Sequence, residues 1–173
     1  TSSVQVSNGT GYKKVEDDKY KKLSMRLLYG EAKLKKGVNA GAVISLESDD
    51  YVDVNAETQK GSTHVFGVFG GFAAGPFTFG GEFALLNSYM LTDKSGNLIS
   101  IYGNYKVSNN LSGFGRFDLG DPDSDTDADG LNYLILGMNY QIDKAFNIAP
   151  TLKMKLPEIG DAVSVYQVNF RFN

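Results

Sequence analysis

The residues best suited to chemistry are charged side chains that alternate with apolar ones. In residues 148–156, for example, Lys153 and Lys155 alternate with Leu152 and Met154. Successive side chains of a strand point to opposite faces, so this pattern gathers the charges on one face. There they can meet water or one another. The charged residues predicted to share this face are Arg26, Glu47, Glu82, Lys106, Arg116, Asp118, Lys153, Lys155 and Arg171.

A second candidate is the acidic segment 121–130 (DPDSDTDADG). Its last three aspartates precede a glycine with the spacing of the first half of a calcium-binding loop, where hard carboxylates suit the hard cation. The twelfth position should be a bidentate acid but is Leu136, so a full EF-hand is excluded. We predict a weak calcium site at Asp125, Asp127 and Asp129; the alternative is a solvated acidic loop.

The only histidine, His64, is the one candidate general base. Ser62, Asp49 and Asp50 are near it in sequence, but a general base needs partners within about 3 Å, which sequence proximity does not supply. No nucleophile elbow, phosphate-binding loop or catalytic carboxylate pair is present. We therefore predict that the chain is not an enzyme and needs no cofactor.

Length and composition exclude several classes of protein. The chain has 173 residues, which suits a single domain over 1–173. Hydrophobic residues make up 42% and there is no cysteine, which excludes a disordered tail and a disulfide framework. Its 17 basic and 20 acidic residues give a formal charge of −3, which argues against nucleic-acid binding. No apolar run is long enough for a membrane-spanning helix.

The elements that must position these charges are strands, because the hydrophobic period is two. Nine segments of roughly ten residues fit this period, the length that a tilted strand needs to cross a bilayer, whereas soluble strands usually have about five or six residues. Residues 1–7 are a short additional candidate. The nine segments are 21–33, 38–47, 63–75, 77–91, 98–108, 111–119, 131–142, 148–156 and 162–173.

The predicted fold is therefore all-β: an antiparallel up-and-down transmembrane β-barrel with 9–10 strands in this chain. Residues 1–7 are short for a full crossing. Either they form a stunted first strand of a ten-stranded barrel, or the chain is N-terminally incomplete and belongs to a larger barrel.

The connections are of two kinds that alternate along the chain. Short turns are expected near 34–37, 75–76, 108–110 and 143–147, and longer polar loops near 49–62, 92–97, 120–130 and 157–161. Outer-membrane barrels have tight periplasmic turns and longer outer loops, which predicts a periplasmic C-terminus. The long loops are acidic whereas the wall is more basic, so the charges alone predict no ion selectivity.

The closing strand and the hairpin at 131–155 resemble the C-terminal part of a general porin of the Gram-negative outer membrane. In that family the last strand carries alternating apolar residues that the barrel-assembly machinery reads. Tyr166, Val168, Phe170 and Phe172 match this signal. The resemblance implies a bacterial outer-membrane location, contact with lipid and lipopolysaccharide, and a homotrimeric assembly.

By this resemblance, the chain is expected to be a porin-like channel for passive diffusion of small hydrophilic solutes or ions. The nine charged residues would line its pore. The alternative is a small non-conducting outer-membrane barrel, with a structural, adhesion or assembly role, in which the same charges pair across a plugged interior.

Overall fold

The computed structural model describes residues 1–8, 21–52, 58–87 and 94–172, and for residues 8, 49–52 and 58–60 it describes only the backbone. The described residues form ten strands and no helix. The strands are β1 (Ser2–Asn8), β2 (Lys21–Tyr29), β3 (Gly37–Val52), β4 (Thr58–Ala74), β5 (Phe77–Asn87), β6 (Ser95–Lys106), β7 (Leu111–Asp121), β8 (Leu131–Gln141), β9 (Phe146–Pro157) and β10 (Val163–Phe172).

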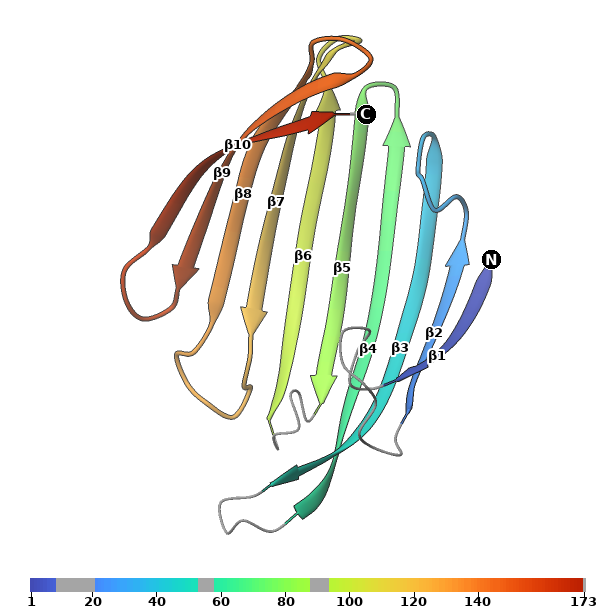
Figure 1. Ribbon diagram of the computed structural model, residues 1–173, viewed down its shortest axis with the longest axis vertical. Coiled ribbons are helices and arrows are strands. Elements are labelled where there is room, and N and C mark those ends of the chain that lie inside the picture. The colour runs from blue at the N-terminus through green and yellow to red at the C-terminus, as the bar shows by residue number, and fades with distance from the viewer. Residues whose placement is uncertain (9–20, 53–57, 88–93, 173) are drawn as a thin grey trace.

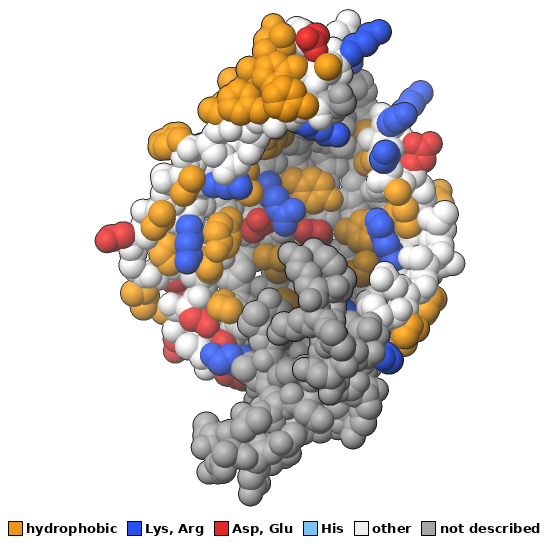
Figure 2. All heavy atoms as spheres, viewed as in Figure 1, with side chains coloured by type: hydrophobic (Ala, Val, Ile, Leu, Met, Phe, Trp, Pro, Cys, Tyr) orange, Lys and Arg blue, Asp and Glu red, His pale blue; other side chains and the backbone are white. Residues whose placement is uncertain are grey.

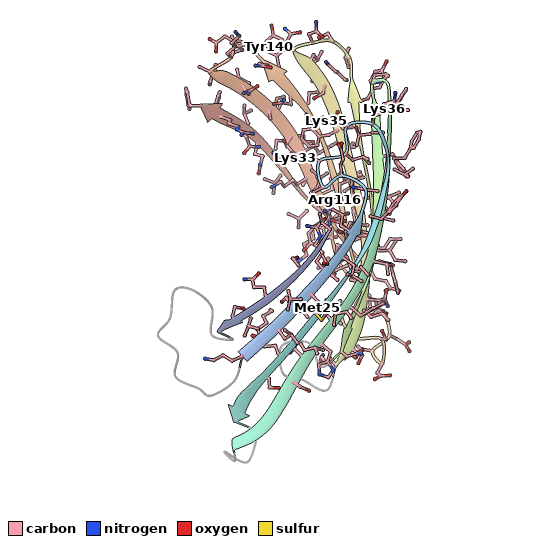
Figure 3. All side chains as sticks on the ribbon, turned by 90° about the vertical axis from the view of Figure 1, so that its right-hand side faces the viewer. Met25, Lys33, Lys35, Lys36, Arg116 and Tyr140 are labelled. Carbon is pink, nitrogen blue, oxygen red and sulfur yellow. The ribbon has the colours of Figure 1, made fainter. Side chains whose placement is uncertain are left out.

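Each strand pairs antiparallel with the next, so the sheet has the order β1 to β10 (Figure 1). The predicted all-β, up-and-down arrangement is thus confirmed, including the short first strand. The predicted closure is not found, because β1 and β10 are the two edges of the sheet and do not pair with each other. Seen from the side, the sheet is a curved, open arc (Figure 3).

Two predicted boundaries were wrong for local reasons. The strand expected over 21–33 ends at Tyr29 because Gly30 and Gly37 adopt φ of +83° and +84°, which reverses the chain at each end of the β2–β3 turn. The loop expected over 49–62 is mostly strand, since β3 and β4 pair as far as Val52 and Thr58. The chain therefore forms a long hairpin there.

The sheet is a single layer without a packed core. Among the described residues, the buried apolar side chains are only Leu28 and Ala73. The chain exposes 11894 Å² of surface, whereas a compact protein of this length would expose about 8300 Å². A water-soluble sheet normally buries one face against a second layer. Here no second layer covers either face in the described part of the chain.

No helix among the described residues is long and apolar enough to span a membrane.

Candidate functional site: the charged concave face

The strand register divides the side chains between a concave and a convex face. Residues directly opposite in an antiparallel pair lie on the same face, as do residues two apart along a strand. By this rule all nine residues predicted to share a face do so, and the face is the concave one, on which Arg116 lies (Figure 3). Figure 2 shows basic and acidic side chains gathered in the middle of this face.

The centre of the concave face is an ion-pair network around Arg116 of β7. Its Nε donates to both carboxylate oxygens of Asp118, at 2.7 and 2.9 Å. Its terminal nitrogen donates to Glu82 of β5 at 3.0 Å and to Ser100 of β6 at 3.1 Å. Ser100 is fully buried beneath this network. The register places Glu82, Ser100 and Asp118 in one row across three strands, so one guanidinium can reach all three.

A second ion pair joins Lys22 of β2 to Glu47 of β3 at 2.9 Å. The three carboxylates on the strands of the concave face, Glu47, Glu82 and Asp118, are therefore all engaged by Lys22 or Arg116. The other predicted cations make no ion pair with a described residue. They are Arg26, Lys106, Lys153, Lys155 and Arg171.

Aromatic rings of neighbouring strands occupy the space beside glycines on the same face. A Cβ on Gly80 would lie 2.6 Å from the Tyr102 ring, and Phe69 and Phe114 similarly occupy the space beside Gly41 and Gly137. The Arg26 guanidinium lies 5.1 Å from the centroid of Phe69, within cation–π range. These glycines lie on strands next to those of their rings. Absent side chains in one strand thus make room for rings from the next.

The β2–β3 turn, residues 30–36, folds over the concave face, which sequence reasoning missed. The Leu34 side chain packs against Gly71 of β4, where an added Cβ would be 3.0 Å from Leu34 Cδ2. The Asn39 amide donates to the carbonyl of Glu31 at 3.0 Å and holds the turn in place. Figure 3 shows Lys33 and Lys35 on the same side of the sheet as Arg116.

The convex face is apolar. Within the described side chains, its only Asp, Glu, Lys or Arg residues are Lys21 and Asp121, at the loop ends of β2 and β7. Most of the large apolar side chains on this face are exposed. The end of the sheet that carries the β2–β3, β4–β5, β6–β7 and β8–β9 connections is called the turn end. On the convex face, the turn end has aromatic contacts: Phe77 and Tyr105 have ring centroids 4.7 Å apart, and Phe146 stacks on Phe170 and Phe172.

The predicted assembly signal lies on this convex face, at the edge strand β10. Tyr166, Val168, Phe170 and Phe172 alternate along its outer side and are 80%, 53%, 59% and 79% exposed. The alternation is as predicted. Its recognition by an assembly machinery stays a prediction.

The acidic loop is organised by Asp123 and not by the three aspartates of the predicted calcium site. Asp123 is buried; its carboxylate accepts from the Thr126 hydroxyl at 2.8 Å and pairs with Lys94 at 3.1 Å. These bonds hold the pKa of Asp123 below its ordinary value, the Thr126 hydrogen bond first. Asp125 and Asp127 are exposed, and Asp129 is half-buried. No group of three metal-binding side chains occurs among the described residues, and the calcium site gains no support.

His64 lies on the convex face of β4, in a row with Leu46 and Asn87. Glu47, the nearest wall carboxylate in sequence, lies on the concave face. The side chains of Asp49 and Asp50 fall outside the described part of the chain. Nothing described here assembles a catalytic group around His64.

Two of the comparisons with known proteins find no match: no family model matches the chain, and no curated protein resembles it in sequence. The two faces of the sheet are therefore the basis for inferring a function.

Proposed function

We propose that the chain forms the wall of a porin-like channel of the bacterial outer membrane, through which small hydrophilic solutes or ions diffuse. The proposal depends on one observation: a single-layer sheet with an apolar convex face and a charged concave face. Lipid would cover the convex face, and water would fill the space enclosed by the concave face.

The distribution of charge supports lipid on the convex side. A Lys or Arg facing lipid near the bilayer midplane costs about 2–4 kcal/mol. The two charged residues of the described convex face, Lys21 and Asp121, lie at strand ends, where they would reach the membrane surface. The convex aromatic rings at the turn end suit the headgroup zone, where one part of a ring is apolar and the other wet.

A channel also requires the two sheet edges to be paired, because unpaired backbone groups are costly in hydrocarbon. β1 and β10 run in opposite directions, since each strand of the ten is antiparallel to the next. They can therefore join each other, or an even number of further antiparallel strands, without breaking the alternation of direction. In either case the apolar and charged faces stay continuous.

The test is conductance of the purified, refolded chain in planar lipid bilayers. A channel gives discrete conductance steps that grow with salt concentration. A chain that inserts into vesicles and resists extraction but gives no steps would be the non-conducting barrel. A chain that stays in the aqueous phase without detergent would overturn the membrane assignment.

A further inference from the structure

We infer that this channel favours anionic solutes, through a basic surface made of Lys33, Lys35, Lys106, Lys153, Lys155 and Arg171. The inference rests on the proposed function and adds the class of solute. Inorganic anions and small carboxylate- or phosphate-bearing molecules share the chemistry that such a surface would recognise.

The first support is an imbalance between paired and unpaired charges on the concave face. The three described carboxylates on its strands are held by Lys22 or Arg116 at 2.7–3.0 Å. A paired carboxylate offers little attraction to a passing cation. The wall cations of the basic surface form no ion pair with a described residue, so their field is not cancelled locally.

The two lysines of β9 show why these charges reach the enclosed water. Lys153 is flanked in the sheet by Ile135 and Val165, and Lys155 by Tyr133 and Val163. None of these neighbours offers a carboxylate, and both lysines are exposed. Their ammonium groups must therefore extend into water. An array of like charges on a low-dielectric wall concentrates counter-ions, here anions.

The infolded β2–β3 turn adds two lysines, Lys33 and Lys35, at the turn end of the same face. Leu34 anchors this turn against Gly71, and both lysines are exposed. Lys33 and Lys35 lie on the concave side (Figure 3). Solute leaving through the turn end would pass this part of the basic surface.

At the level of Lys153, the acidic outer loops oppose this field only weakly at physiological salt. Lys153 lies four residues from Pro157, where β9 meets its loop, a distance of about 13 Å along the strand. The Debye length at physiological ionic strength is about 8 Å. The loop carboxylates are therefore largely screened at the level of Lys153.

The experiment measures reversal potentials of the refolded chain in planar bilayers under a potassium chloride gradient. We expect chloride to permeate several-fold faster than potassium. The double substitution Lys153→Gln/Lys155→Gln should bring the two permeabilities close to equal. The matched control Asp125→Asn/Asp127→Asn removes two charges from the outer loop and should leave the ratio nearly unchanged.

A double substitution of the turn, Lys33→Gln/Lys35→Gln, provides a second measurement outside the strands and should also lower the chloride preference. An open channel that prefers potassium would overturn this inference and leave the proposed function intact. The same holds if neither set of lysine substitutions changes the ratio. A properly folded chain without conductance would overturn the proposed function, and this inference with it.

Discussion

At the scale of single residues, Arg116 has the largest set of partners on the concave face. It holds Glu82, Asp118 and the buried Ser100 at once. A cation that serves two carboxylates cannot be removed without leaving like charges close together in the same row. The cost is moderated because the Arg116 side chain is 38% exposed, and water screens what remains.

We therefore expect Arg116→Gln to lower the free energy of unfolding by about 1–2 kcal/mol. Urea titration in detergent micelles measures this change. Lys106→Gln is the matched control, since Lys106 has no ion-pair partner among the described residues and its change should stay below about 0.5 kcal/mol. Adding Glu82→Gln and Asp118→Asn to Arg116→Gln should recover part of the loss. Equal losses in Arg116→Gln and the control would refute a structural role for the network.

Asp123 gives a prediction for the effect of pH on the acidic loop, residues 121–130. Its carboxylate has a folded pKa below the ordinary value of 3.8, so its charged form stabilises the loop at any pH above that value. This contribution is lost as the pH falls through the lowered pKa, when the pair with Lys94 breaks. Acidification should then loosen residues 121–130, with the Asp125 amide, which donates to Asp123, among the first groups affected.

Amide chemical shifts and exchange rates of this loop, followed from neutral to acid pH, measure the transition. Asp123→Asn should abolish the transition, because the side chain no longer titrates, and should leave the loop looser at neutral pH. An unchanged titration in Asp123→Asn would mean that another acidic residue controls the loop.

At the scale of elements, the two faces of a strand should tolerate charge very differently. Ile101 and Asn104 both belong to β6, but Ile101 lies on the convex face and Asn104 on the concave face. If lipid covers the convex face, Ile101→Lys should weaken folding into vesicles by about 2–4 kcal/mol, whereas Asn104→Lys should have little effect. Reversible folding into vesicles under urea compares the two variants. Equal tolerance of both would contradict the proposed membrane wall.

The strands and their faces could be predicted from the sequence because alternation is a local property. The sequence of β9 alone predicts that Lys153 lies on one face and Leu152 and Met154 on the other. The Arg116 network could be predicted only in part, since its contacts depend on the register of three strands. The contact of Leu34 with Gly71 likewise depends on how β3 pairs with β4. Such long-range pairing leaves no short-range pattern.

The acidic loop shows a different limit. Aspartates at alternate positions match the start of a calcium loop, and the pattern drew attention to Asp125, Asp127 and Asp129. In the structure the organising residue is Asp123, because Thr126 and Lys94 both reach it. A sequence motif describes only spacing along the chain, whereas Lys94, which directly precedes β6, is distant from Asp123 in sequence.

At the scale of the whole molecule, β10 is an unpaired edge of the open sheet, whereas the proposed channel requires it to be paired. Ile142 N–H donates to Phe146 O in the β8–β9 turn. Along a strand, the backbone N–H and C=O groups of successive residues point alternately to one neighbouring strand and to the other. The even-numbered residues of β9 therefore bond to β8, and its odd-numbered residues bond to the odd-numbered residues of β10. The N–H groups of the even-numbered residues of β10, which carry the convex side chains, point to the free edge. On β1, Thr1 exchanges hydrogen bonds with Leu28, so the even-numbered residues again face outward.

Both free edges therefore present the backbone groups of their convex residues, and pairing them keeps apolar residues opposite apolar ones. In a bilayer we expect the amides of Tyr166, Val168 and Phe170 to exchange with deuterium as slowly as those of Val165 and Gln167, which face β9 and serve as the internal control. If the even-numbered amides exchanged rapidly in vesicles while the odd-numbered ones stayed protected, the edge would be unpaired. That result would exclude a closed wall, whether it is made by β1 pairing with β10, by a second copy or by further strands. It would also contradict the membrane assignment, because an unpaired edge is too costly in hydrocarbon.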